Sequence, residues 1–293
     1  MRPAGASGGR AASDGAQSGA GHGAASDDAG AGALHVERSG HGQRVVLVHG
    51  FTQSSAIWAD IAGGLADSHE IVVPDLPGHG RSPQATGDIA TAADRLAESC
   101  GKGTYIGYSL GGRICLHLAL RRPILVQRLV LVATTAGIDD LSERASRRQA
   151  DDALAERIAG GGDEGIPGFV DEWLQGPLFS HLSERQANRD ARLVNTAGGL
   201  ASALRCMGVG GQLPLWEQVR AIRMPVLVLA GENDPKFVAL GDRLAAAIGE
   251  NAMFVLVPDS GHAVPFEQPD SFSALVRSFA AGEIWSPPAK SAG

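Results

Sequence analysis

Ser109 lies in the segment that most constrains how this chain can fold, GTYIGYSLGGRICLHLALRR at residues 103–122. The segment begins as an apolar run, turns within the five residues from Gly107 to Gly111, and continues in a pattern typical of a helix. A serine between glycines at a strand-to-helix turn is pushed out of the sheet, because the glycines permit a tight turn. The segment therefore predicts a strand of a parallel sheet with an exposed Ser109 hydroxyl at its carboxyl end.

Other apolar runs predict the remaining strands of that sheet, once the ordered chain begins near ALHVERSG. The closing segment, residues 271–282, has the pattern of an amphipathic helix. Strands that alternate with helices indicate an α/β protein with a mostly parallel central sheet and helices on both faces. The expected strands lie within residues 44–50, 70–80, 126–137, 224–235 and 251–262.

Residues 138–220 interrupt this alternation because they contain no β-branched run. Helical patterns occupy residues 142–159 and 183–195 instead. A structureless insertion of this length is uncommon in a compact domain, so we expect an inserted helical cap over the carboxyl ends of the strands. The predicted organisation is a tail at 1–33, a core at 34–137 and 221–282, the cap at 138–220, and a flexible C-terminal tail at 283–293.

The charge balance restricts the kinds of partner. The chain has 25 Lys and Arg residues against 32 Asp and Glu residues, a net charge of -7, whereas nucleic-acid and membrane-surface proteins usually carry a basic excess. No apolar run approaches the ~18 residues that a transmembrane helix needs. We therefore expect neither a nucleic-acid nor a membrane partner. The sequence leaves the oligomeric state, monomer or homodimer, open.

Composition also bears on the terminus and the cellular location. Residues 1–33 are almost entirely Gly, Ala, Ser and Asp and lack the apolar centre of a signal peptide, so we expect a disordered tail whose presence in the mature protein is open. Cys100, Cys115 and Cys206 are too far apart for a disulfide framework or a metal site. Cys115, in an apolar run, is expected to be buried. These features favour a cytoplasmic location.

Two further residues complete a predicted catalytic triad with Ser109. Asp234 in AGENDP and His262 in DSGH each follow a predicted strand, in the chain order Ser, Asp, His. His262 would accept the serine proton, while Asp234 would fix its tautomer and stabilise the imidazolium. Glu232 and Asp259 are rival acids, although Glu232 precedes the usual turn position.

An oxyanion hole is expected from two backbone amides, those of Leu110, after the serine, and Phe51, after VHG. His49 and His79 each precede a glycine in a Gly-rich loop, and we interpret them as loop-shaping residues. No motif in the sequence indicates a metal or another cofactor.

Arg113 follows Ser109 by four residues, so the two lie on one helix face near the helix N-terminus. A guanidinium at this position can bind a carboxylate bidentately, which favours a substrate that carries carboxylates. The alternative is a salt bridge between Arg113 and an acid of the cap.

The triad context resembles the α/β-hydrolase superfamily over residues 44–282. GYSLGGR, ERASRRQAD, DEWLQGPLF, GGLASALRCMGVGGQLPLW and GENDPKF together resemble the 2-succinyl-6-hydroxy-2,4-cyclohexadiene-1-carboxylate synthases of menaquinone biosynthesis. The resemblance implies a lyase that eliminates pyruvate from a substrate with three carboxylates, with no cofactor. It implies that Arg113, Arg147 and Arg192 bind those carboxylates and that Tyr108 and Trp173 line the pocket. Arg148 and Arg189 are the near alternatives for the two cap arginines.

In the mechanism that this resemblance implies, Ser109 acts as a base and removes the proton alpha to the succinyl ketone, while the amides of Phe51 and Leu110 stabilise the enolate. The same triad also fits a serine carboxylesterase or C–C bond hydrolase, in which Ser109 is a nucleophile. A non-catalytic ligand-binding module of the same fold is a third alternative.

Overall fold

The computed structural model describes residues 32–82, 84–180 and 182–284. The two predicted tails, residues 1–33 and 283–293, lie almost wholly outside the described residues. None of the helices in the described ranges is long and apolar enough to cross a membrane.

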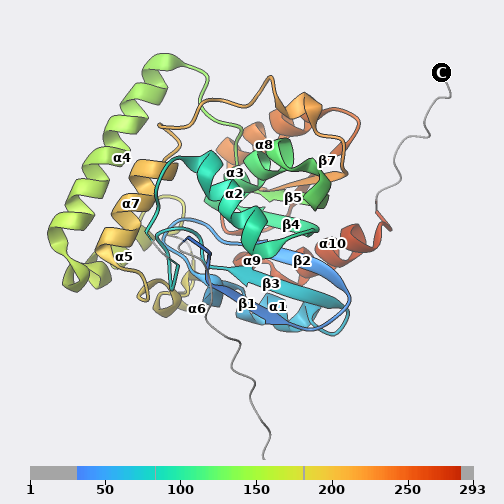
Figure 1. The fold of residues 1–293 in the computed structure, drawn as a ribbon, viewed down its shortest axis with the longest axis horizontal. Helices are drawn as coiled ribbons and strands as arrows, with labels where there is room; N and C mark the ends of the chain where they lie inside the picture. The colour runs from blue at the N-terminus through green and yellow to red at the C-terminus, as the bar shows by residue number, and fades with distance from the viewer. Residues whose placement is uncertain (1–31, 83, 181, 285–293) are drawn as a thin grey trace, which may run out of the picture. The chain divides into compact units, whose positions relative to one another are not determined.

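A seven-stranded sheet organises the described chain, in the order β1-β3-β2-β4-β5-β6-β7 (Figure 1). Every pair of neighbouring strands is parallel except β1 with β3, which is antiparallel. Each sequence segment predicted to hold a strand does hold one, so the prediction of a mostly parallel α/β sheet is confirmed. The strands are β1 Val36–Ser39, β2 Gln43–Val48, β3 His69–Pro74, β4 Gly103–Tyr108, β5 Val126–Val132, β6 Val226–Gly231 and β7 Ala252–Val257.

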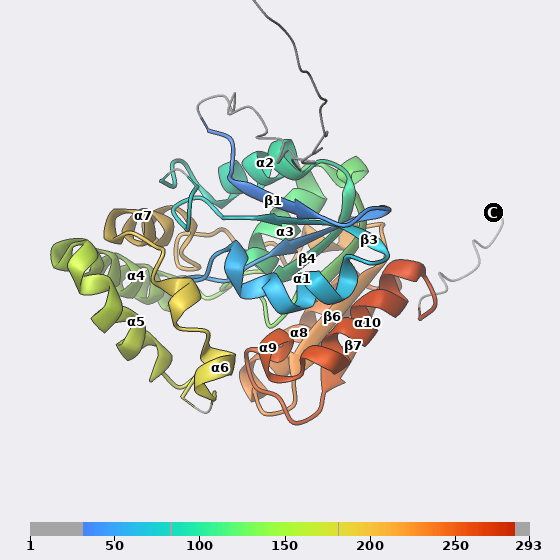
Figure 2. The same cartoon turned by 90° about the horizontal axis from the view of Figure 1, so that it is seen from below.

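Helices cover both faces of the sheet, because successive side chains of a strand point to opposite faces. Val46 and Val48 of β2 belong to the cluster formed with α2, α3 and α8, whereas Val45 and Leu47 belong to the cluster formed with α1 and α10. The two layers are seen from a second direction in Figure 2. The covering helices are α1 Ala59–Leu65, α2 Ile89–Cys100, α3 Leu110–Arg121, α8 Pro235–Ile248 and α10 Pro269–Ala281, and the short α9 spans Val264–Glu267.

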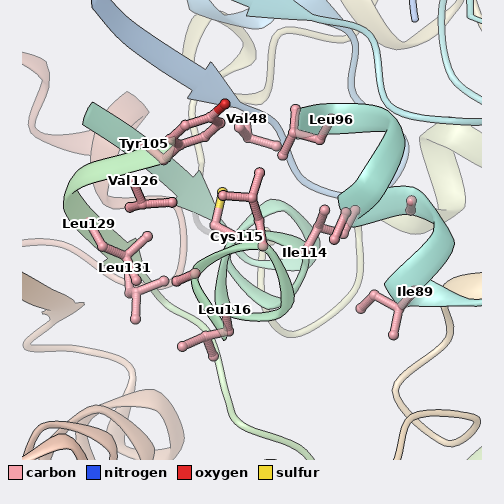
Figure 3. Close-up of a cluster of buried hydrophobic side chains, with 14 of the residues drawn as sticks. Val48, Ile89, Leu96, Tyr105, Ile114, Cys115, Leu116, Val126, Leu129 and Leu131 are labelled. Atoms are coloured by element: carbon pink, nitrogen blue, oxygen red, sulfur yellow. The ribbon is translucent and has the colours of Figure 1, made fainter. Parts of the chain in front are cut away.

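Helix α3 is buried around most of its circumference (Figure 3). Its residues Ile114, Cys115 and Leu116 are fully buried in a cluster that also contains Tyr105 of β4 and Leu129 of β5. Burying an aliphatic side chain of this size contributes roughly 1.5–3 kcal/mol, so the helix that begins beside Ser109 is held rigidly on the sheet.

The three cysteines differ in exposure. Cys100 and Cys115 are buried, which confirms the prediction for Cys115, whereas Cys206 is partly exposed. Burial raises the pKa of the Cys100 thiol from 9.0 to about 12 and raises that of Cys115 as well. Both buried thiols therefore remain protonated and behave as small apolar side chains.

Between β5 and β6 the chain forms a group of helices, residues 138–220, which we call the inserted segment. Apolar residues of α4, α5 and α7, such as Ile158, Val170 and Leu200, build a core of their own there. The assignment of this segment to a separate cap domain stays a prediction. Its helices are α4 Leu141–Gly161, α5 Ile166–Leu174, α6 Glu184–Ala187 and α7 Ala197–Met207.

One helix predicted in the inserted segment is wrong. Residues 142–159 lie within α4, but residues 183–195 form only the short α6 and a 3-10 turn at Asp190–Arg192. Asn188 ends α6 because its backbone is left-handed, with a φ of 46°. An asparagine adopts this conformation more readily than most residues, which allows the chain to turn at this point.

Candidate active site

Ser109 occupies the turn between β4 and α3, where its backbone has a φ of 53°. A non-glycine residue in this region is strained by about 1–3 kcal/mol and persists only where its surroundings hold it. The Ser109 amide donates to Val132 O over 2.9 Å, and its carbonyl accepts from Thr134 Oγ1 over 2.8 Å. These bonds fix the turn that presents the hydroxyl.

Two glycines allow α3 to approach the sheet closely at this turn. A Cβ on Gly107 would lie 2.6 Å from Gly111 O, and a Cβ on Gly111 would lie 2.4 Å from Val48 O. Real Cβ atoms essentially never come so near to backbone atoms. The glycine spacing seen in the sequence is therefore required by close packing of the backbone.

The structure brings Ser109, Asp234 and His262 together from the carboxyl ends of β4, β6 and β7. Nδ1 of His262 lies 3.0 Å from Oδ2 of Asp234, and Nε2 lies 3.4 Å from Oγ of Ser109. Asp234 also caps α8, since its Oδ1 accepts from the Phe237 amide over 3.2 Å. With Nδ1–H directed at Asp234, the lone pair on Nε2 faces the serine hydroxyl.

The carboxylate of Glu267, at the end of α9, holds the loop that carries His262. Its two oxygens accept from the amides of Gly261 and Ala263, each over 2.8 Å. The rival acids Glu232 and Asp259 are exposed. Among the described residues, Asp234 is the acid that contacts the imidazole of His262.

The amides of Phe51 and Leu110 both belong to residues that line the cavity at Ser109. Within the described residues neither amide has a hydrogen-bond acceptor. Leu110 is the first residue of α3, where a helix leaves its amides unpaired and its dipole favours negative charge. This arrangement can stabilise an oxyanion beside Ser109.

His49 and His79 shape the loops behind Phe51, as the sequence indicated. His49 donates from Nδ1 to Gly50 O over 2.8 Å and accepts from the Leu76 amide at Nε2 over 2.9 Å. Burial lowers the pKa of His49 to about 4 and that of His79 to about 3. Both imidazoles are therefore neutral at neutral pH and act as hydrogen-bonding spacers.

A cavity of about 850 Å³ lies over Ser109 and His262 and is walled by both the core and the inserted segment. Tyr108 Oη and Trp173 Nε1 are buried and have no partner within the described residues, and both residues line this cavity. Because both atoms are closed off from solvent, these two residues form the cavity wall with their rings and not with these polar atoms. Burial also raises the pKa of Tyr108, which keeps its hydroxyl protonated.

The three arginines predicted to bind substrate lie in different environments in the structure. Arg113 is buried on the cavity wall, and its partners are the uncharged Gln212 Oε1 at 2.9 Å and Met207 O at 2.7 Å, so the alternative of a salt bridge is not what is observed. Arg147 also lines the cavity, and its Nε donates to Asp151 over 2.9 Å.

Arg192 lies deeper than the other two predicted arginines. It is 1% exposed, donates to Ala187 O and Thr52 Oγ1, and is not among the residues that line the cavity. The alternatives Arg148 and Arg189 are absent from the cavity wall as well, and they pair with Asp152 and Asp171 respectively.

Several residues that shape the site were missed by sequence reasoning. Lys236 and Arg243 on α8 line the cavity, but cations at these helical positions carry no local signal in the sequence. Asn195 and Gln212 act through contacts with Thr52 and Arg113, which are far away along the chain. In the described ranges no cluster of three or more His, Cys, Asp or Glu side chains could hold a metal ion.

The sheet, the elbow and the Ser-Asp-His arrangement define the class of α/β-hydrolase-fold proteins. The model of the family described as alpha/beta hydrolase fold matches residues 43–269 of the chain. The match covers the strands that carry Ser109, Asp234 and His262.

Individual relatives narrow this class. The chain is 36% identical to the putative 2-succinyl-6-hydroxy-2,4-cyclohexadiene-1-carboxylate synthase of Bacillus subtilis (strain 168), over 81% of the chain and 90% of the relative. It is 30% identical to the synthase of the same name from Serratia proteamaculans (strain 568), over 84% of the chain and 97% of the relative. The chain belongs to this synthase family within the α/β hydrolases.

A solved structure agrees with this assignment. The structure of MenH from S. aureus superposes with a TM-score of 0.78 at 30% identity, covering 85% of this chain and 98% of that chain.

Proposed function

We propose that this chain is a lyase of menaquinone biosynthesis. Its reaction eliminates pyruvate from 2-succinyl-5-enolpyruvyl-6-hydroxy-3-cyclohexene-1-carboxylate and gives 2-succinyl-6-hydroxy-2,4-cyclohexadiene-1-carboxylate. The observation that carries the proposal is Arg113, a buried cation on the cavity wall that has no acidic partner within the described residues. A neutral ester gives such a cation no role, whereas a substrate with three carboxylates does.

The triad supplies the base. Ser109, whose proton passes to Nε2 of His262, removes the proton alpha to the succinyl ketone, and Asp234 stabilises the imidazolium that results. The electron pair of the broken C–H bond enters the ketone and forms an enolate. The amides of Phe51 and Leu110 donate to its oxygen, as they would to a tetrahedral intermediate.

The enolate then collapses through the ring alkene. A new ring double bond forms, the C–O bond to the enolpyruvyl group breaks, and the departing enolate takes up a proton to become pyruvate. Atoms and electrons balance without an oxidant or a second substrate.

The cavity wall provides the binding groups. Arg113 and Arg147 bind substrate carboxylates, and the rings of Tyr108 and Trp173 line the cavity against the same ligand. Lys236, whose ammonium lies over the Phe237 ring and has no acidic partner within the described residues, takes the carboxylate that the sequence resemblance assigned to Arg192. The inserted segment acts as the cap that closes this cavity.

A serine carboxylesterase is the second candidate, because the distance of 3.4 Å between Ser109 Oγ and His262 Nε2 also suits nucleophilic attack. In that reaction Ser109 would carry an acyl group. The triad therefore cannot separate the two activities, but the substrate can.

Pyruvate release tests the proposal. The substrate is generated enzymatically just before use, and pyruvate is measured with lactate dehydrogenase against a control without the protein, because the substrate decomposes slowly by itself. We expect fast release from the wild type, its loss in Ser109→Ala and Arg113→Ala, and normal release in Arg122→Ala, whose exposed side chain pairs with Asp94. Turnover of a nitrophenyl ester with no pyruvate above the control would establish the esterase instead.

A further inference from the structure

Gln212 holds Arg113 in place on the cavity wall. Its Oε1 accepts from Nη1 of Arg113 over 2.9 Å, and its Nε2 donates to Ala136 O over 3.2 Å. Gln212 is only 2% exposed. Because a guanidinium can only donate, the amide oxygen of Gln212 must face Arg113, and its amino group must then face Ala136.

The backbone around Gln212 is fixed independently of its side chain. The Leu215 amide donates to the same Ala136 carbonyl over 2.7 Å, and Nε1 of Trp216 donates to Gly137 O over 3.1 Å. The residues that follow β5 therefore form a rigid support, and Gln212 links the Arg113 guanidinium to that support by hydrogen bonds.

The uncharged nature of this contact is unusual for a buried cation. Removing a guanidinium from water is costly, and buried charges are normally paired with an opposite charge. Burial, together with the nearby charge of Arg147, lowers the pKa of Arg113 from 12.5 to about 10, although Asp151 acts in the opposite direction. A glutamate at position 212 would offer a counter-charge in the same shape, whereas the chain has the neutral amide.

We propose that Gln212 is a positioning residue that orients Arg113 while leaving its charge un-neutralised, so that the cation remains available for a carboxylate of the ligand. This inference rests on the proposed function for the identity of that ligand. It adds that the affinity for carboxylates depends on the neutrality of position 212 and not only on the presence of Arg113.

Three substitutions distinguish the effect of charge at position 212 from the effect of side-chain shape. Gln212→Glu keeps the shape and places a carboxylate against Arg113, Gln212→Met removes both hydrogen bonds and adds no charge, and Gln218→Glu makes the same chemical change at an exposed position outside the cavity. Steady-state pyruvate release gives kcat and KM, and thermal unfolding gives Tm for each variant.

We expect the largest effect from the substitution that is most conservative in shape. Gln212→Glu raises KM about 30-fold with a smaller change in kcat, because a competing carboxylate removes one charge-assisted contact from the substrate. Gln212→Met raises KM only about threefold, by loosening Arg113. Gln218→Glu leaves KM and kcat unchanged. If Gln212 had only a structural role, Gln212→Met would be at least as harmful as Gln212→Glu, and that order would overturn the inference.

Succinate binding separates failure of the inference from failure of the proposed function. Calorimetry measures its dissociation constant for the wild type and for Gln212→Glu. Weaker succinate binding by Gln212→Glu supports the inference even if the wild type releases no pyruvate, an outcome that would reject the proposed function alone. Succinate that binds both proteins equally, or neither, overturns the inference.

Discussion

Nδ2 of Asn195 donates a hydrogen bond of 2.7 Å to the carbonyl oxygen of Thr52. This bond joins the inserted segment to the loop that carries the Phe51 amide. Thr52 has a φ of 67°, a strained value for a β-branched residue, and Arg192 donates to its hydroxyl. The loop is thus held in its conformation by side chains that lie more than 130 positions away along the chain.

We expect Asn195→Ala to lower kcat about 10- to 100-fold while KM changes less than threefold, because the Phe51 amide is no longer preorganised for the oxyanion. Asn251→Ala is the matched control, since Asn251 also donates from Nδ2 to a backbone carbonyl, Ile222 O at 2.8 Å, but neither residue lines the cavity. The control should lose about 1 kcal/mol of unfolding free energy and keep its kcat. Equal losses of kcat in both variants would contradict the role of Asn195.

Asp234→Asn tests the triad without removing the helix cap. Asparagine caps a helix as well as aspartate does, so the unfolding free energy should change by less than about 1 kcal/mol. We expect kcat to fall roughly 10³- to 10⁴-fold, because the amide favours the wrong imidazole tautomer and cannot stabilise an imidazolium. Asp88→Asn makes the same change at the cap of α2, where Asp88 accepts from the Thr91 amide over 2.9 Å, and should keep full activity. Activity that survives in Asp234→Asn would show that the base works without this acid.

Because His79 is buried, the free energy of unfolding should fall in mildly acidic solution. In the unfolded chain a histidine titrates near pH 6.5, whereas burial lowers the pKa of His79 in the folded chain to about 3. Below pH 6.5 the unfolded state therefore binds a proton that the folded state does not, and the unfolding free energy falls as the pH drops towards 3. His49 acts in the same direction down to about pH 4.

Urea unfolding at pH 8, 7 and 5 measures this effect in the wild type and in His79→Gln. We expect the wild type to lose about 2 kcal/mol more than His79→Gln between pH 7 and pH 5, since each histidine of this kind contributes about 1.4 kcal/mol per pH unit. Between pH 8 and pH 7 the unfolding free energies of the two proteins should change by the same amount. Equal changes in unfolding free energy from pH 8 to pH 5 would mean that His79 is protonated in the folded protein.

Gly111→Ala should disrupt the elbow. Its new methyl group would lie 2.4 Å from Val48 O and 2.6 Å from His49 O, two backbone atoms that cannot move aside. We expect a loss of roughly 2–4 kcal/mol in unfolding free energy. Gly63→Ala on α1 is the control, because its added Cβ would have no neighbour within 4 Å and should raise stability by about 0.5–1 kcal/mol. Similar stabilities for the two variants would rule out steric necessity at Gly111.

Sequence reasoning located the residues that follow strands. Ser109, Asp234 and His262 each follow an apolar run, and the carboxyl ends of parallel strands meet at one edge of the sheet. A local sequence pattern was therefore enough to predict that these three residues lie close together. Strand β1 was not predicted as a strand, because Val36–Ser39 is short and mostly exposed at the edge of the sheet and shows no apolar run.

Sequence reasoning was weakest in the inserted segment. Arg192 was placed on a continuous helix, but the left-handed Asn188 breaks that helix and turns Arg192 towards Ala187 and Thr52. The contact between Gln212 and Arg113 spans 99 positions along the chain. No periodicity encodes such pairings, since they depend on how the inserted segment packs on the core.

The unequal burial of the three cysteines gives the protein a single intrinsic attachment point for a spectroscopic probe. Burial raises the pKa of all three thiols, but Cys206 alone is partly exposed, so a maleimide in mildly alkaline solution labels Cys206 and leaves the enclosed sulfurs of Cys100 and Cys115 unlabelled. Cys206 lies on α7 directly before Met207, whose carbonyl holds Arg113. A fluorophore at Cys206 therefore reports on the cavity wall during ligand binding without any engineered residue.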